Sequence, residues 1–478
     1  MRRSFIAGRR MREIKPDGSV EEFFTRYYWP GDHPLDHVEF LLKYDDLNLD
    51  LLEQVFRRLP AADVDAYVAE SPTSKYRRRI GFLYEFLTPN NLKTEVGGNF
   101  VPILDPKRYF TGSGIREPRW RVIDNLLGGA GCCVLVRRTL EIERKLRINW
   151  PEQIRQLTSQ ADPRQWNRAV NYFYLKETKA SFAIEREEVT PDRGERFMAV
   201  LAQAGTTDGE QLLSVERLTQ RQNTIVDPRY AEKGFRTEQN FVGQTLPNFD
   251  EKVHYVCPPP ALVPTLIAGL RTFYVRGRGL PPPVRAAVIS FGFVFVHPFI
   301  DGNGRLHRLL LHELLARDGY MDRGIVLPFS AAMLRDSARY DQVLESVSRV
   351  VNQRVRYRLE RGNKLVIENA REAEGVWRYL DLTSQVEYVL DLIEATVLRD
   401  LPDELNALER IDHLTSEIKR VVDLPTRKLN LLLELLRENG GKLSAGKRAS
   451  TFAELTDDEV AAIEIAYAKR FLIQSGKL

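Results

Sequence analysis

Twelve residues, HPFIDGNGRLHR at positions 297–308, concentrate side chains that could act on a phosphate group. A histidine, one carboxylate, Gly-Asn-Gly and two arginines follow each other directly after a strongly apolar run. Glycines let a backbone turn its N–H groups toward one point, and the positive end of a helix attracts anions. Gly302, Asn303 and Gly304 therefore predict a phosphate-binding nest at the start of a helix that begins near Arg305.

The charged residues around this nest predict a division of roles. Arg305 and Arg308 are three residues apart, so both can face one region of a helix and bind phosphate oxygens through paired hydrogen bonds. Asp301 is the only carboxylate of the loop and is expected to hold Mg²⁺. His297 precedes the nest and is the best placed group to take a proton from a nucleophile. His307 lies about 200° around the helix from Arg305 and should point away.

Two other interpretations use the same residues. Taken singly, each residue would suit a buried core histidine, a solvated helix end or a surface arginine, but packing does not require this set in this order. A metal site would have to bring His297, His307 and His312 together. His307 and His312 are five residues apart and do not share a helix face as an i, i+4 pair would. The phosphate interpretation is therefore preferred.

Two buried helices are needed to position this segment. Residues 284–296 are apolar on nearly every face, which predicts a buried helix that starts after three prolines and ends at His297. Pro298 forces the chain out of that helix, and Phe299 is expected to anchor the loop in the core. The next helix is predicted over 304–319, where Asp318-Gly319 provides a stop.

Other elements follow from periodicity and turn residues. Helices are predicted over 36–59, 166–187, 261–277 and 425–441, and a capping box of Thr456 and Glu459 starts a last helix. Residues 94–110 predict a β-hairpin or an extended loop. Residues 234–260 break the helical pattern and predict a hairpin with strands at 239–243 and 252–256.

Composition sets further limits. The chain has 478 residues, of which 43% are hydrophobic and 28% charged, and this is typical of a globular protein of about two to four domains. A net charge of +4 is far from the basic excess of a chain that mainly binds nucleic acid. Cys132, Cys133 and Cys257 are expected to be reduced core thiols of a cytoplasmic protein. We expect no export signal and no membrane span.

Residues 297–308 resemble the signature of the Fic family, H-x-F-x-(D/E)-G-N-G-R-x-x-R, and match every fixed position. Fic enzymes typically transfer AMP from ATP to a hydroxyl side chain of a target protein and release pyrophosphate. The resemblance implies that His297 is the general base and that Asp301 binds Mg²⁺. It also implies that Gly302 to Gly304 form the anion hole and that Arg305 and Arg308 clamp the phosphates. The related Doc kinases carry Lys in place of the second glycine, so Gly304 favours nucleotidyl transfer.

The resemblance extends over about residues 165–350 and gives the predicted hairpin a role. Family members use such a hairpin, called the flap, to hold a target segment as an added strand, which recognises main chain with little demand on sequence. The alternative is a surface hairpin without a partner. The edge of the flap in this chain would consist of Gln239, Asn240, Phe241, Val242 and Gly243.

A second segment resembles the inhibitory motif (S/T)-x-x-x-E-(G/N), which in one class of Fic proteins precedes the catalytic core. Ser181 to Glu185 fit this pattern, while Arg186 stands where Gly or Asn is expected. The resemblance implies that Glu185 pairs with Arg308 and blocks the γ-phosphate of ATP. The alternative is that Glu185 is simply one charge of the acidic run EREE at a helix end.

These expectations combine into a mainly α fold with a Fic-type helical core and a β-hairpin flap. The predicted parts are a helical N-terminal accessory region (1–115), a helical segment with the inhibitory helix (116–190), the catalytic core (191–360) and a C-terminal helical domain that could contain a winged helix (361–478).

The expected protein is a cytoplasmic, Mg²⁺-dependent protein adenylyltransferase that uses ATP and is inhibited by Glu185. Its expected partners are a target protein, itself through self-modification, and a second copy in a homodimer. One alternative is removal of AMP from a modified protein by a metal-bound water that Glu185 positions. The other is a DNA-binding regulator, which the 11 basic and 8 acidic residues of 419–478 support only weakly.

Overall fold

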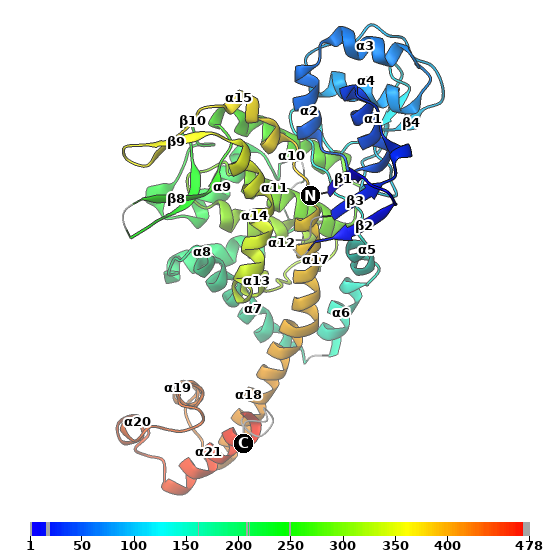
Figure 1. The fold of residues 1–478 in the computed structure, drawn as a ribbon. Helices are drawn as coiled ribbons and strands as arrows, with labels where there is room; N and C mark the ends of the chain where they lie inside the picture. The colour runs from blue at the N-terminus through cyan, green and yellow to red at the C-terminus, as the bar shows by residue number, and fades with distance from the viewer. Residues whose placement is uncertain are drawn as a thin grey trace. The chain divides into compact units, whose positions relative to one another are not determined.

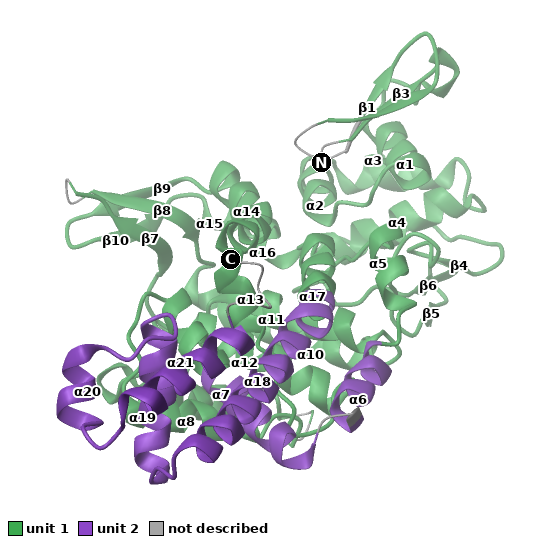
Figure 2. Ribbon diagram, turned by 90° about the horizontal axis from the view of Figure 1, so that it is seen from below, with its two compact units in different colours: residues 1–149, 176–393 green, residues 150–175, 394–478 purple. Residues whose placement is uncertain are grey.

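The computed structural model describes residues 2–15, 20–160, 162–206, 209, 211–247 and 250–471 (Figure 1). The chain divides into two compact units (Figure 2). Unit 1 contains residues 1–149 and 176–393, and unit 2 contains residues 150–175 and 394–478. The four-part division remains a prediction. No helix of the described residues is long and apolar enough to cross a membrane.

The N-terminal part of unit 1 starts with a three-stranded sheet that the sequence did not predict. The strands are β1 (Arg2–Ile6), β2 (Met11–Ile14) and β3 (Val20–Phe24), in the order β1-β3-β2. They have four or five residues each and are rich in charged side chains, so their period-two pattern is weak. The 3-10 turn η1 (Arg26–Tyr28) follows.

Four helices follow this sheet along the chain, so the region is largely helical. They are α1 (Pro34–Tyr44), α2 (Leu49–Arg58), α3 (Ala61–Ala69) and α4 (Lys75–Leu87). The single predicted helix over 36–59 is two helices, because the Asn48 side chain accepts the Leu51 N–H at 2.9 Å and starts α2. Phe56, Leu83 and Tyr84 lie in the core of this region.

Residues 94–110 form an extended loop instead of a hairpin. Strand β4 (Val101–Pro102) pairs in parallel with β6 (Val122–Asp124), which in turn pairs antiparallel with β5 (Ile115–Glu117). Parallel strands cannot be joined by a tight turn. Because β4 pairs in parallel with a strand further along the chain, residues 94–110 do not form a hairpin. Helix α5 (Leu140–Leu146) follows this small sheet.

The centre of unit 1 is built on three consecutive helices that confirm the sequence pattern: α10 (Val263–Arg276), α11 (Pro282–Val296) and α12 (Asn303–Arg317). In α11, all residues except Pro282 and Val294 are buried, as its uniform apolarity predicts. Gly292 lets α10 approach closely, since a Cβ atom there would lie 2.6 Å from Leu270 Cδ2. Cys132, Cys133 and Cys257 are buried free thiols, and burial raises each thiol pKa to about 12.

Further elements surround these helices. Helix α7 (Pro163–Ile184) leads into α8 (Pro191–Ala202), α9 (Val215–Ile225) and the short turn η2 (Pro228–Tyr230). The predicted hairpin is present as β7 (Phe241–Thr245) paired antiparallel with β8 (Glu251–Val256), and η3 (Pro260–Leu262) follows it. After α12 come α13 (Phe329–Arg335), α14 (Ser337–Arg354), β9 (Tyr357–Glu360), β10 (Lys364–Ile367), α15 (Ala370–Ala373), α16 (Gly375–Arg378) and α17 (Thr383–Ala395).

Unit 2 has its own apolar core. Besides the first part of α7, it contains α6 (Trp150–Gln160), the π-helical turn η4 (Thr396–Asp400), α18 (Leu401–Val421), α19 (Thr426–Glu438), α20 (Ala445–Thr451) and α21 (Asp457–Phe471). The predicted capping box is present, because Glu459 accepts the Thr456 N–H at 2.8 Å and Thr456 Oγ1 accepts the Glu459 N–H at 3.2 Å. Residues 394–471 contain helices and connecting turns but no strand, so this described part has no wing.

Candidate active site

His297 is held at the end of α11 in a conformation that leaves one ring nitrogen free to act as a base. Its backbone is left-handed, with φ 50° and ψ 60°, and its N–H donates to the Phe293 carbonyl at 3.0 Å. The ring Nδ1 lies 3.2 Å from the Val294 carbonyl oxygen. Because a carbonyl can only accept, Nδ1 carries the proton and Nε2 keeps its lone pair. Burial, and next the Arg236 cation, lower the His297 pKa to about 4, so the ring is neutral at pH 7.

The loop after His297 is fixed by Asn303 and Phe299. Asn303 is buried, its Oδ1 accepts the Phe299 N–H at 3.0 Å, and its Nδ2 donates to the Phe299 carbonyl at 2.8 Å. The Phe299 side chain is fully buried, as predicted, and its ring packs on Phe235. The Asn303 side chain therefore holds the loop, and only its backbone N–H is left for an anion.

Helix α12 begins earlier than the sequence predicted, within the anion nest. Gly302 is the N-cap, with φ 89°, and α12 begins at Asn303 instead of near Arg305. The first N–H groups of a helix have no partner inside it, so those at Asn303, Gly304 and Arg305 are available to a ligand. A Cβ atom at Gly304 would lie only 2.0 Å from Oε1 of Glu185, so the carboxylate of Glu185 lies directly on this helix start.

Arg308 is buried and is bound by the end of α7. Its Nε donates to Ser181 Oγ at 2.9 Å, and its Nη2 donates to the Ser181 carbonyl at 2.8 Å and to Glu185 Oε1 at 2.8 Å. The pair expected from sequence is present, although one carboxylate oxygen, and not two, binds the arginine. Arg308 is 1% exposed and Glu185 34%, so the ion pair lies at the edge of the core, where screening by water is reduced.

The turn that ends α7 explains why Gly or Asn is expected at position 186. The Glu187 N–H donates to the Phe182 carbonyl at 3.1 Å and the Arg186 N–H to the Ala183 carbonyl at 3.0 Å, which is the Schellman pattern. Its C′ residue is left-handed, and Arg186 accordingly has φ 59°. The turn thus contains a strained arginine between two glutamates that both face α12.

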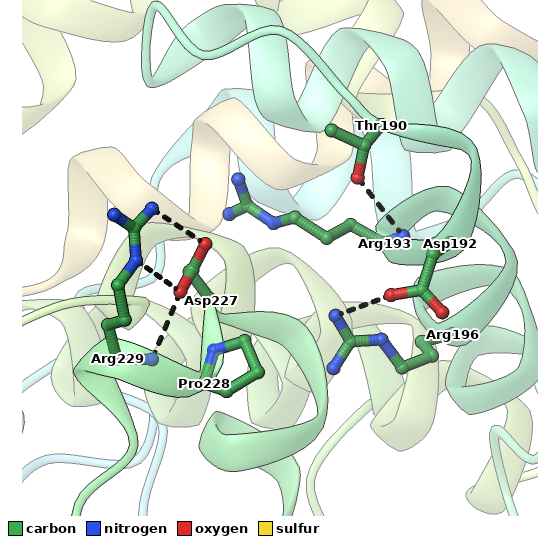
Figure 3. Close-up of a pocket in the computed structure, with 7 residues that line it drawn as sticks. All are labelled: Thr190, Asp192, Arg193, Arg196, Asp227, Pro228 and Arg229. Atoms are coloured by element: carbon green, nitrogen blue, oxygen red, sulfur yellow. Dashed lines mark hydrogen bonds and ion pairs between the residues drawn. The ribbon is translucent and has the colours of Figure 1, made fainter.

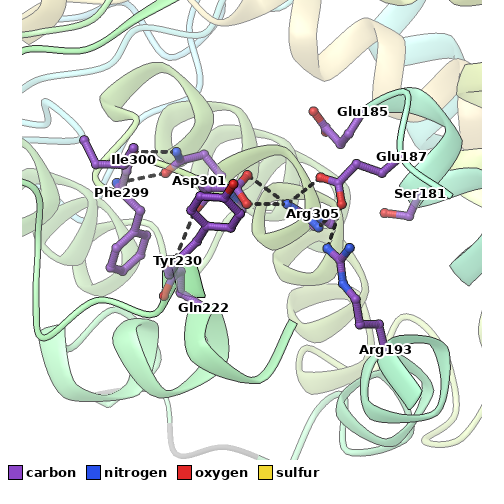
Figure 4. A network of polar contacts seen from close by, with 12 residues as sticks. Ser181, Glu185, Glu187, Arg193, Gln222, Tyr230, Phe299, Ile300, Asp301 and Arg305 are labelled. Carbon is purple, nitrogen blue, oxygen red and sulfur yellow. Dashed lines mark hydrogen bonds and ion pairs between the residues drawn. The ribbon is translucent and has the colours of Figure 1, made fainter. Parts of the chain in front are cut away.

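Glu187 is a site residue that the sequence analysis missed. Its Oε1 lies 3.0 Å from Arg305 Nη2, and its Oε2 accepts hydrogen bonds from Arg305 Nη1 at 3.1 Å and Arg193 Nη2 at 2.6 Å (Figure 4). The guanidinium groups of Arg305 and Arg193 both lie over the ring of Phe182. The sequence analysis assigned a role only to Glu185 of the acidic run EREE, whereas Glu187 of the same run binds Arg305. Glu187 directly follows the left-handed residue of this turn, which is position C″ of a Schellman motif. That position was the signal that could have identified Glu187.

Arg193 also lines a shallow pocket at the start of α8 (Figure 3). The other charged side chains in its wall form ion pairs with each other, Arg196 with Asp192 at 3.0 Å and Arg229 with Asp227 at 2.9 Å. The positive charges of this pocket are therefore compensated by the protein. Arg193 links this pocket to the site, because it also donates a hydrogen bond to Glu187.

Asp301 fits one mode of magnesium binding. Arg305 Nη2 donates to both carboxylate oxygens, at 2.8 and 3.0 Å, and the Gly302 N–H donates to Oδ1 at 2.6 Å. The carboxylate is 37% exposed. Among the described residues no group of three or more His, Cys, Asp and Glu could hold a metal ion. A single accessible carboxylate beside an anion nest suits Mg²⁺ bound jointly by protein and phosphate, and does not suit an all-protein cage.

The predicted flap edge is only partly a strand. Phe241, Val242 and Gly243 lie in β7, while Gln239 and Asn240 precede it. Asn240 Nδ2 donates to the Ile300 carbonyl at 3.3 Å, which joins the hairpin to the loop after His297. In the described sheet, β7 pairs only with β8, so its other edge is open to an added strand.

The other two histidines of the metal alternative have separate packing roles. His307 packs against Phe291, with ring centroids 4.5 Å apart, and burial lowers its pKa to about 3. It points away from the nest, as predicted. His312 Nε2 lies 3.0 Å from Oε1 of Glu177, a buried residue of α7 that also accepts the Ser330 N–H at 2.7 Å. This contact fixes α7 to α12 two turns before Glu185.

Comparisons of the sequence with known proteins relate the chain to the Fic family. Residues 212–315 match the model of the Fic/DOC family. Over 202 residues the chain is 25% identical to a probable protein adenylyltransferase of Aquifex aeolicus, covering 42% of this chain and 53% of that protein. Over 102 residues it is 36% identical to a protein adenylyltransferase of Caenorhabditis briggsae, covering 21% and 18%. The chain thus spans about half, or less, of these relatives. A Fic family protein from Desulfovibrio desulfuricans has a similar structure, with 20% identity and a TM-score of 0.41, over 63% of this chain and 88% of that one.

Proposed function

We propose that this chain, whose residues 212–315 match the Fic/DOC family model, is a protein adenylyltransferase that moves AMP from ATP to a hydroxyl side chain of a target protein. The observation that carries this proposal is the free Nε2 of a neutral His297 beside an anion-binding helix start with two buried arginines. A neutral imidazole accepts a proton, and the helix start and arginines stabilise phosphate charge.

The proposed reaction is a single displacement at the α-phosphorus. His297 Nε2 takes the proton of the target hydroxyl while its oxygen forms a bond to the α-phosphorus. The bond from that phosphorus to the oxygen bridging to the β-phosphate breaks, and pyrophosphate leaves with that electron pair. The N–H groups of Asn303, Gly304 and Arg305 hold phosphate oxygens, and the guanidinium groups of Arg305 and Arg308 neutralise the leaving group.

Asp301 would hold Mg²⁺ when ATP is bound, and this ion would supply further neutralisation of phosphate charge. Oδ2 of Asp301 accepts one hydrogen bond, from Arg305, and keeps a lone pair that could bind the ion. Arg305 would have to leave both Asp301 and Glu187 to turn to a phosphate oxygen. We therefore expect AMP transfer to require a divalent cation.

We further propose that the resting enzyme inhibits itself through Glu185. The carboxylate lies on Gly304 and binds Arg308, so it takes the place that a phosphate would otherwise occupy. Charge-assisted hydrogen bonds of this kind are about twice as strong as neutral ones. Glu187 adds a second contact of the same kind, on Arg305. One turn thus holds both motif arginines.

Removal of AMP from a modified protein is a second candidate function. The carboxylate of Glu185 is accessible and close enough to His297 to affect its pKa, so it could orient a water beside the base. Incubating AMP-modified target with wild type and Glu185→Gly distinguishes the two functions. Removal requires Glu185, whereas transfer is faster without it. A DNA-binding role is less favoured, because α21 starts with Asp457, Asp458 and Glu459, which repel phosphates.

The proposal is tested by intact-mass spectrometry of cell lysate proteins and of the enzyme itself after incubation with ATP and Mg²⁺. The expected result is a mass increase of one AMP on the enzyme, on a target or on both, with release of pyrophosphate and dependence on Mg²⁺. Transfer of a phosphate alone would instead indicate a kinase.

A further inference from the structure

Arg236 connects three separate segments of the site through backbone carbonyls. Its side chain is 3% exposed and belongs to the segment that leads into the flap. Nε donates to the His297 carbonyl at 2.8 Å, Nη1 to the Glu238 carbonyl at 2.8 Å and Nη2 to the Pro258 carbonyl at 2.6 Å. In addition, the Arg236 N–H donates to the Pro298 carbonyl at 2.9 Å.

The three carbonyls that Arg236 binds belong to the two ends of the flap and to the base. Glu238 directly precedes the flap edge, and Pro258 lies two residues after strand β8 ends at Val256, so Arg236 holds both roots of the hairpin. His297 carries the base, and its carbonyl lies at the negative end of α11, where a cation is stabilised. A planar guanidinium can hold three such acceptors in fixed directions, which a lysine ammonium on a flexible stem cannot do.

We propose that Arg236 is a positioning residue for AMP transfer, which fixes the flap that presents the target hydroxyl at a constant spacing from the base His297. This inference rests on the proposed function. It assigns Arg236 no contact with ATP or target. Arg236 acts by aligning the target hydroxyl with His297. Misplacement of reacting groups by about 1 Å can reduce a rate by about 100-fold.

The hairpin keeps other contacts when Arg236 is replaced, so the variants should fold. The Tyr255 hydroxyl donates to the Phe295 carbonyl at 2.6 Å, and Trp377 Nε1 donates to the Val256 carbonyl at 3.1 Å. Both contacts hold β8 and are independent of the arginine. They do not hold the segment around Glu238. That segment is held near His297 by Arg236 at the Glu238 carbonyl and, more weakly, by Asn240 Nδ2 at the Ile300 carbonyl, at 3.3 Å.

The test compares Arg236→Lys with its parent, both carrying Glu185→Gly so that transfer is measurable. Lysine keeps the charge and most of the volume, but its three donors are on one nitrogen and do not match carbonyls spaced to bind Nε, Nη1 and Nη2 of the guanidinium. Arg229→Lys in the same background is the matched control, because Arg229 is exposed and pairs with Asp227 only within its own turn. The measurements are AMP transfer to short peptides with one Thr, Ser or Tyr, the KM for ATP, and amide hydrogen exchange.

The expected result is a kcat for peptide modification that is roughly 10- to 100-fold lower in Arg236→Lys, with an unchanged KM for ATP. Amide exchange should become faster around 236–241 and stay slow in α11 and α12. Equal kcat in Arg236→Lys and its parent would overturn the proposal, and so would equal exchange at the hairpin roots. A loss of ATP binding or of cooperative unfolding in Arg236→Lys would also overturn it, because the residue would then be a general stabiliser. If the parent transfers no AMP, the proposed function fails, and the exchange measurement still decides whether Arg236 fixes the flap.

Discussion

Glu185 Oε1 lies 2.8 Å from Nη2 of Arg308, and the same oxygen covers the first turn of α12 at Gly304. The carboxylate therefore uses both features that would bind a phosphate, the helix start and a buried guanidinium. Ser181 holds the same arginine through its hydroxyl and its carbonyl. The contact that we propose to be inhibitory thus joins Arg308 to residues at the end of α7.

Replacing Glu185 by glycine should raise the rate of AMP incorporation by roughly one or more orders of magnitude, because Arg308 and the helix start become free to position ATP. The measurement is incorporation of label from ATP into protein at fixed ATP and Mg²⁺. Glu188→Gly is the matched control, since Glu188 is an exposed glutamate three residues further on. Equal rates in Glu185→Gly and wild type would place the inhibition elsewhere.

Glu187→Gln should raise the basal rate as well, by a smaller factor than Glu185→Gly. The substitution keeps the size of the side chain but weakens its hold on Arg305, which must turn from Glu187 to a phosphate. The Glu185→Gly, Glu187→Gln double variant should be faster than either single variant, and Glu188→Gln should behave as wild type. If Glu187→Gln leaves the rate unchanged in both backgrounds, the Arg305 contact has no inhibitory role.

Arg186→Gly should strengthen inhibition. Arg186 has φ 59°, a left-handed conformation that costs an ordinary residue about 1 kcal/mol and glycine almost nothing. Relieving this strain stabilises the turn that presents Glu185 and Glu187, so basal activity should fall about fivefold. Arg186→Lys keeps charge and strain and should be close to wild type. A fall of similar size in Arg186→Lys would show that the guanidinium, and not the backbone, sets the effect.

The rate of transfer should be nearly independent of pH from about 5 to 8. His297 acts as a base only when neutral, and burial lowers its pKa to about 4, so the neutral form is lost only as the pH falls toward that value. The measurement is kcat/KM of Glu185→Gly across this range with constant ionic strength. An acid limb centred near 6.5, the ordinary value for histidine, would mean that His297 is solvated in the working enzyme.

The site was predicted more completely than the architecture around it. The order of His297, Asp301, Gly302 and Arg308 is local in sequence, and the apolar helix before it has a single interpretation, so both could be identified directly. Glu187 and Arg236 were missed because their partners are more than 60 residues away in sequence, and only folding brings them to Arg305 and to the His297 carbonyl. The N-terminal sheet was missed because its strands are too short for their pattern to stand out.

The most direct test of the account is intact-mass and pyrophosphate measurement on Glu185→Gly and on Glu185→Gly combined with His297→Ala. Both proteins are incubated with ATP and Mg²⁺ under identical conditions, after circular dichroism has shown the same fold. We expect Glu185→Gly to incorporate AMP into protein and to release one pyrophosphate for each AMP. The variant without His297 should bind ATP but incorporate roughly 100-fold less AMP. Equal incorporation by the two proteins would contradict the assignment of His297 as the base, and no incorporation by either would contradict AMP transfer itself.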